Sequence, residues 1–141
     1  MTDLGPQGPS LRPPTPLINT SGQIVGTYAL NSGTSGTFLY TGGMMTRLPQ
    51  PGGSSVGYGS AINDSGEIAG FLFTSSQYHA AKFSNGVRTD LGVITAAPQN
   101  EAKAINDSGQ IVGTSLFPST YKPFKAGKHV PFISTASGLS I

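Results

Sequence analysis

The chain has 141 residues, of which 10% are charged and none is cysteine, and its formal net charge is +2. This length suits one domain with a real hydrophobic core, and the lack of cysteine excludes disulfides, thiolate zinc sites and cysteine nucleophiles. The few Lys and Arg residues form no cluster, and no apolar run approaches the roughly 18 residues of a membrane span. We therefore expect neither a nucleic-acid partner nor membrane insertion.

The chain opens with a short extended segment at residues 1–5, because Met-Thr-Asp-Leu-Gly there lines up with Arg-Thr-Asp-Leu-Gly at residues 88–92. We interpret residues 1–5 as a partial strand, equivalent to the last strand of a repeated unit. The residues that follow, up to 16, lack the basic and then apolar order of a signal peptide.

A nine-residue motif then occurs three times, in the form Ile-Asn-x-Ser-Gly-x-Ile-x-Gly. A sequence period of about 43 residues indicates one supersecondary unit, which buries its apolar face only by stacking on a neighbour. The motif spans residues 18–26, 62–70 and 105–113. The sequence thus predicts a single repeat domain over residues 1–141, with units at about 14–57, 58–100 and 101–141.

Each unit is predicted to hold four short strands, and the middle unit displays them most clearly. Turn residues separate the apolar segments, and no window has apolar residues at the 3.6-residue spacing of a helix, so helices should be nearly absent. The strands of the middle unit are expected at residues 60–63, 67–73, 79–84 and 87–91. The third strand is expected to begin near Phe38 in the first unit and near Phe124 in the last.

The motif also predicts the turn between the first and second strands of each unit. An Asn side chain closes an Asx turn, and Gly accepts the positive φ of a tight hairpin. The Ile after this turn should occupy matching buried sites at Ile24, Ile68 and Ile111. The residues that we assign to the structural turn are Asn19, Gly22, Asn63, Gly66, Asn106 and Gly109.

Four phrases occur in the order found in a known group of bacterial proteins. They are residues 52–55, 61–70, 79–81 and 85–92. Together they resemble the bacterial HAF-repeat family of probable extracellular repeats, and the resemblance covers nearly the whole chain. The His-Ala-Phe tripeptide that gives the family its name is incomplete in every copy here. The resemblance implies a β-propeller-like module, extracellular or at the cell surface, with no established chemistry.

The strand segments themselves point to stacked sheets. Apolar residues follow one another in segments such as Phe71-Leu72-Phe73, which indicates strands buried on both faces, as in propeller blades. Closed propellers usually need about four to eight blades, more than the three units found here. Three architectures remain open: part of a longer array, a homo-oligomer whose chains complete a ring, most simply as a dimer, and a β-trefoil.

Metal and catalytic chemistry find little support in the sequence. Asp64 and Asp107 offer carboxylates in the turns, but their spacing does not match a calcium loop, and Thr20 replaces them in the first copy. His79 and His129 occupy unrelated positions in the repeat, and nothing marks a nucleophile for either. We therefore expect no metal, no cofactor and no enzymatic activity.

Aromatic rings and amides leave one binding chemistry open, because sugars stack on aromatic faces and hydrogen-bond to amides. The candidate exposed rings are Tyr28, Tyr58, Tyr78 and Tyr121. The leading hypothesis is a non-enzymatic β-repeat module for binding or for cell-surface structure. The alternative is a lectin-like carbohydrate-binding protein.

Overall fold

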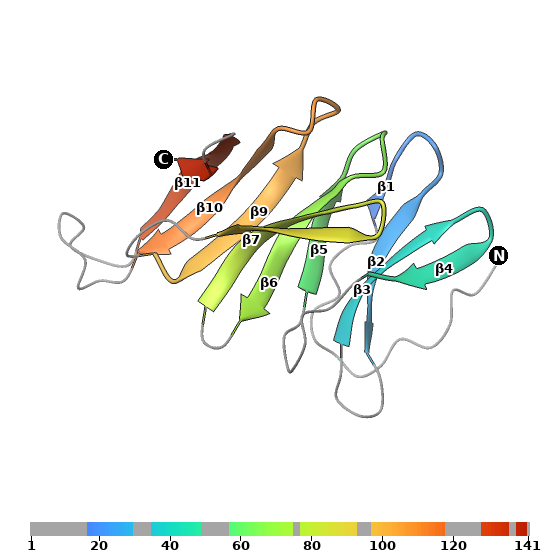
Figure 1. Ribbon diagram of the computed structural model, residues 1–141, viewed down its shortest axis with the longest axis horizontal. Coiled ribbons are helices and arrows are strands. Elements are labelled where there is room, and N and C mark those ends of the chain that lie inside the picture. Colours follow the sequence, from blue (N-terminus) through green and yellow to red (C-terminus); the bar gives the residue numbers. More distant parts are fainter. Residues whose placement is uncertain are drawn as a thin grey trace.

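The computed structural model describes residues 17–29, 35–48, 57–74, 77–92, 97–117, 128–135 and 138–140. These residues form an all-β structure of two sheets and contain no helix, as the apolar spacing predicts (Figure 1). The expected strand at residues 1–5 and the candidate ring of Tyr121 lie outside the described residues. The strands are β1 (Leu17–Ile18), β2 (Ile24–Ala29), β3 (Ser35–Thr41), β4 (Met44–Arg47), β5 (Gly57–Ile62), β6 (Ile68–Thr74), β7 (Gln77–Ser84), β8 (Val87–Gly92), β9 (Gln99–Ile105), β10 (Ile111–Phe117), β11 (Lys128–Thr135) and β12 (Gly138–Ser140).

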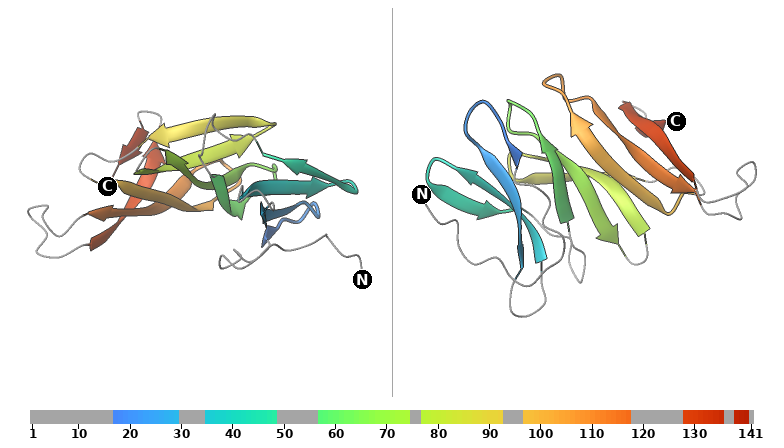
Figure 2. Two further views of the ribbon diagram at one scale, coloured as in Figure 1. Left: turned by 90° about the horizontal axis from the view of Figure 1, so that it is seen from below. Right: turned by 180° about the vertical axis from the view of Figure 1, so that it is seen from behind.

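The strands form three consecutive antiparallel meanders, which we call the first unit (β1–β4), the second unit (β5–β8) and the third unit (β9–β12). The first unit is a sheet of its own, whereas a short parallel contact between Tyr78 on β7 and Gln99 on β9 joins the other two. Figures 1 and 2 show the second unit between the other two. The strands of the second unit correspond to the four segments expected there.

The third unit differs from expectation in the position of its third strand. The sequence period favours a start near Phe124, whereas β11 begins at Lys128, and residues 118–127 lie outside the described part of the chain. The register explains the shift, because Phe132 pairs with Gly113 as Phe38 pairs with Gly26. Three phenylalanines follow the last motif, and the last of them, Phe132, stands opposite the motif glycine.

The predicted hairpin turns are confirmed at their glycines. Gly22, Gly66 and Gly109 have φ values of 74°, 78° and 76°. The turn between β7 and β8 places Asn85 at φ 50° and Gly86 at φ 74°, which is the conformation that Asn-Gly adopts in a two-residue hairpin.

The hydrophobic core lies between successive units, because alternate residues of each strand point to opposite faces. We call the face that carries Ile68 and Leu72 the N-side face, because it packs on the preceding unit, and the opposite face, which carries Ala69, the C-side face. Between the first and second units, Val25 from a C-side face packs in one cluster with Ile68, Leu72 and Phe83. Between the second and third units, the corresponding cluster joins Ala69 and Ala80 to Ala102 and Ile111.

The matching burial expected for the three motif isoleucines holds for two of them. Ile68 and Ile111 are each 1% exposed, whereas Ile24 is only half-buried. The physical reason is its position on the N-side face of the first unit, where no other described unit packs. Ile18, beside it on the same face, is 67% exposed for the same reason.

Candidate functional site: the turn ladder and the end face

The asparagine of each motif closes its own turn. Its side-chain oxygen accepts the backbone N–H of the residue four positions later, at 2.9, 2.8 and 2.9 Å in the three units. Its side-chain nitrogen donates to the side-chain oxygen of that same residue, which is Gln23, Glu67 or Gln110, at 2.7, 2.9 and 2.7 Å. The same pair of hydrogen bonds therefore recurs in every unit.

The asparagines also connect one turn to the next. Asn19 Nδ2 donates to the backbone carbonyl of Asn63 at 2.9 Å, and Asn63 Nδ2 donates to the carbonyl of Asn106 at 2.9 Å. All these donations run from the earlier turn to the later one. We call the stacked turns Asn19–Gly22, Asn63–Gly66 and Asn106–Gly109 the turn ladder.

A second row of hydrogen bonds runs parallel to the first, through the residue after each asparagine. The Thr20 N–H donates to Asp64 Oδ1 at 3.0 Å, and the Asp64 N–H donates to Asp107 Oδ1 at 2.9 Å. The hydrogen bond from the Thr20 backbone holds the pKa of Asp64 below its ordinary value. The motif carboxylates thus act as acceptors between turns, a role that supports the interpretation of Asp64 and Asp107 as turn residues.

A half-buried ion pair supports the middle of the ladder. Lys82 Nζ lies 2.8 Å from Glu67 Oε1, while Asn63 donates to the other carboxylate oxygen of Glu67. These two hydrogen bonds, that from Lys82 first, lower the pKa of Glu67. The other two units have glutamine at this position, Gln23 and Gln110. Glutamate occurs in the second unit, where Lys82 on the neighbouring strand pairs with it.

The first and second units are also joined by a buried threonine that the sequence did not single out. Thr37 Oγ1 donates to the Gly57 carbonyl at 2.7 Å and accepts the Gly59 N–H at 2.9 Å. The Thr37 side chain is fully buried, and its hydroxyl hydrogen-bonds to two backbone groups of β5 at this interface. No sequence signal marked Thr37, because its role depends on the packing of one unit against another.

The C-side face of the third unit is the uncovered end of the stack. Val112 and Ile133, which pair across β10 and β11, are 44% and 53% exposed. They line an open cavity of about 340 Å³. Its other lining residues are Ala104, Ile105, Asn106 and Gln110. We call this surface the end face.

The end face is equivalent, residue for residue, to faces that are covered elsewhere in the chain. Val112 corresponds to Val25 and Ala69, which are 1% and 0% exposed. The corresponding cavity between the first two units has a volume of only about 100 Å³. Gln23 and Leu39 line it on one side, and Ile68 and Phe83 of the second unit line it on the other. The third unit therefore presents the surface on which the first and second units each receive a neighbour.

The turn ladder ends at the same place with unused donors. The Asp107 N–H has no acceptor among the described residues, although the equivalent Asp64 N–H is bonded. Asn106 Nδ2 donates within its own turn but not to a further carbonyl in the described part of the chain. No further described turn covers Asn106, which is exposed, whereas Asn63 lies between two turns and is only 4% exposed.

Comparison with family models, with curated proteins and with solved structures finds no match for this chain. The likeness to HAF repeats therefore rests on the sequence motifs. Across the ranges that the structure describes, no helix is long and apolar enough to cross a membrane.

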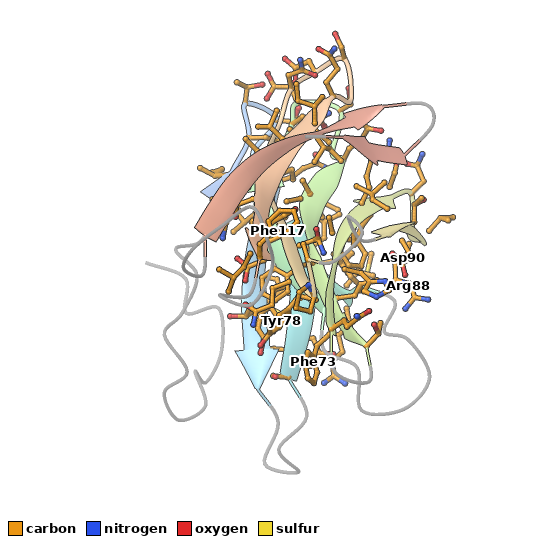
Figure 3. The ribbon with its side chains drawn as sticks, turned by 90° about the vertical axis from the view of Figure 1, so that its left-hand side faces the viewer. Phe73, Tyr78, Arg88, Asp90 and Phe117 are labelled. Atoms are coloured by element: carbon orange, nitrogen blue, oxygen red, sulfur yellow. The ribbon has the colours of Figure 1, made fainter. Side chains whose placement is uncertain are left out.

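The candidate tyrosines do not form one site. Tyr58 and Tyr78 are half-buried and lie on either side of Phe71, with ring centroids 5.1 and 5.4 Å from it. Phe73 packs on Tyr78 at 5.1 Å, and Figure 3 shows these two rings together. Tyr28 lies elsewhere, on β2, with the guanidinium of Arg47 4.9 Å above its ring. The tyrosines placed by the structure thus pack against other side chains.

Among the described residues, His79 and Asp90 form a histidine–carboxylate pair that sequence reasoning missed. His79 Nδ1 lies 2.9 and 3.1 Å from the two oxygens of Asp90, which also accepts the Gly92 N–H. Figure 3 shows Asp90 beside Arg88 on β8. In the described residues no third His, Asp or Glu joins such a pair as a metal ligand. The contact fixes the outer strand β8 to β7, and the antiparallel register of these strands is the signal that would have revealed it.

Proposed function

We propose that this chain is a non-enzymatic β-repeat module for binding or for cell-surface structure, which acts through its end face. The observation that carries the proposal is the equivalence of the exposed Val112 to Val25 and Ala69, both buried under a neighbouring unit. Each square ångström of apolar surface left in water costs roughly 25 cal/mol. Binding of a complementary face at this site is therefore favourable.

The same argument supports a homo-oligomer, in which another chain covers the end face. The two core clusters each join only consecutive units, an arrangement that favours blade-like stacking over a trefoil, where three units share one core. A dimer with six units is the simplest closed ring. The extracellular or cell-surface location rests on the resemblance to HAF repeats.

A pair of matched substitutions tests the role of the end face. Val112→Glu places a charge on this face between β9 and β11, whereas Val87→Glu places the same charge at the first residue of β8, which is 63% exposed. Light scattering of the wild-type chain should give a mass above 14.4 kDa that rises with concentration. Val112→Glu should abolish this rise and Val87→Glu should not. Equal behaviour of the two variants, or a wild-type monomer at all concentrations, contradicts the proposal.

Carbohydrate binding is the second candidate function, and the composition of the cavity favours it. The amides of Asn106 and Gln110 lie beside the apolar surface of Val112, a combination that suits the hydroxyls and the ring face of a sugar. A thermal-shift screen of sugar classes separates the two candidates. Saturable stabilisation by one class, lost in Val112→Glu, would favour the lectin-like function over assembly.

A further inference from the structure

We propose that the end face binds the N-side face of the first unit in a second copy of this chain, so that the turn ladder continues from Asn106 of one chain to Asn19 of the next. This inference rests on the proposed function and adds the partner surface and its orientation. The contact is head-to-tail, with a different surface contributed by each chain.

The two exposed faces at the ends of the stack are complementary in the same way as the faces that pack together between consecutive units. Ile18 is 67% exposed at the start of the ladder, whereas the equivalent Ile62 and Ile105 pack against the clusters between units. Val112 and Ile133 provide at the other end the apolar face that an isoleucine of this kind contacts. Joining the ends therefore covers the exposed apolar residues of both faces.

The hydrogen bonds of the ladder give the contact its polarity. Every hydrogen bond between the described turns is donated by the earlier turn and accepted by the later one. In the proposed contact, Asn106 Nδ2 donates to the carbonyl of Asn19 in the second copy, and the Asp107 N–H donates to its Thr20 side chain. Two donor ends cannot make these bonds to each other, so an end-face-to-end-face dimer leaves the ladder donors unpaired.

Thr20 sets the strength of this junction. At the equivalent position Asp64 and Asp107 each offer a carboxylate oxygen, whereas Thr20 offers only a shorter and uncharged hydroxyl acceptor. Charge-assisted hydrogen bonds are about twice as strong as neutral ones. The junction between chains is therefore weaker than the junctions within a chain, and the assembly is reversible.

Engineered cysteines test the orientation directly, because the chain has no cysteine of its own. Thr20→Cys and Asp107→Cys are made as separate full-length variants and then mixed under mild oxidation. The proposal predicts disulfide-linked heterodimers of Thr20→Cys with Asp107→Cys, in clear excess over either homodimer. Thr20→Cys with Asn85→Cys, at the turn between β7 and β8 and outside the end face, is the negative control and should not couple.

A positive control shows whether the ladder geometry permits a disulfide at all. Thr20→Cys and Asp64→Cys within one chain occupy neighbouring turns of the existing ladder, and they should form an intramolecular bond. If they do, while Asp107→Cys pairs with itself or with Asn85→Cys as readily as with Thr20→Cys, the head-to-tail contact is refuted. Loss of oligomer in Val112→Glu would in that case leave the proposed function standing. A wild-type chain that is monomeric throughout refutes both.

Substitution of Thr20 provides a graded test with little risk to folding, because this side chain is exposed. Thr20→Asp restores the motif carboxylate and should tighten association about tenfold, whereas Thr20→Val removes the hydroxyl acceptor and should weaken it. Sedimentation velocity measures both dissociation constants against the wild type. An unchanged constant in both variants overturns the proposal that Thr20 accepts the Asp107 N–H.

Discussion

The side chain of the motif asparagine can make three hydrogen bonds, and its position in the stack decides how many of them form. Asn63 accepts the Glu67 N–H, donates to the Glu67 carboxylate and donates to the Asn106 carbonyl of the next turn. Among the described residues, the Asn106 side chain makes only the two bonds within its own turn. The two residues have the same local chemistry and differ in burial and in one bond between units.

That difference predicts unequal losses of stability. Asn63→Ala should lower the free energy of unfolding by about 2–3 kcal/mol, because it leaves buried partners unpaired on two turns. Asn106→Ala should lower it by about 1 kcal/mol, because water reaches the groups that are left. Urea unfolding of both variants at a concentration where the chain is monomeric provides the comparison. Equal losses would mean that the bond between turns contributes nothing.

At the scale of the strand and the turn, the hairpins follow from local sequence, whereas the ladder does not. Asn-x-Ser-Gly requires a tight turn whatever surrounds it, so the positive φ of Gly66 was predictable from four residues. The bond from Asn19 to Asn63 joins residues 44 positions apart and exists only because the units stack in register. For the same reason, the local sequence did not reveal the role of Thr37 or the pair of His79 with Asp90, since both depend on how strands and units pack together.

The exposure of the tyrosine rings could not be predicted from residue type alone. Their type suggested exposed rings, but alternation along the strands decides exposure, and Tyr58 and Tyr78 point to the C-side face where Phe71 packs between them. The third strand of the last unit was expected to begin near Phe124 because that phenylalanine keeps the sequence period. The pairing of Gly113 with Phe132, which depends on the register between β10 and β11, places β11 later in the chain.

The ion pair between Glu67, just before β6, and Lys82 on β7 predicts how stability changes with pH. The folded pKa of Glu67 lies below its ordinary value of 4.5, so the unfolded chain binds this proton more tightly. The stabilisation is therefore fully present above that ordinary pKa and is lost as the pH falls through the folded pKa. Glu67→Gln, which restores the residue found at positions 23 and 110, should flatten the acid limb of a stability–pH curve measured by urea unfolding. Glu101→Gln, whose partner Lys103 is more exposed, is the matched control substitution in the same measurement.

At the scale of the whole molecule, the stack has a direction, because the hydrogen-bond donors between its turns point one way and, among the described residues, the unused ladder donors lie at the Asn106 end. Apolar contacts between units are nearly symmetrical under exchange of the two partners, since any β face buries surface against another. The ladder removes this ambiguity, because a unit added with the wrong face would leave N–H groups without acceptors. The hydrogen bonds between turns thus specify which face of a unit packs on its neighbour, and burial of the apolar faces supplies most of the free energy of packing between units.

This direction predicts a pattern of amide hydrogen exchange along the ladder. In a dilute, monomeric sample the amides of Thr20 and Asp64 should exchange slowly, because each donates to a carboxylate of the next turn, whereas the Asp107 amide should exchange rapidly. Raising the concentration should slow exchange at Asp107 as its N–H acquires an acceptor from another chain. NMR exchange measurements at several concentrations test this, with Thr20 and Asp64 as internal references. Protection of Asp107 equal to that of Asp64 in the monomer would show that the ladder is already closed within one chain, and the end face would then have no donor left to specify a partner.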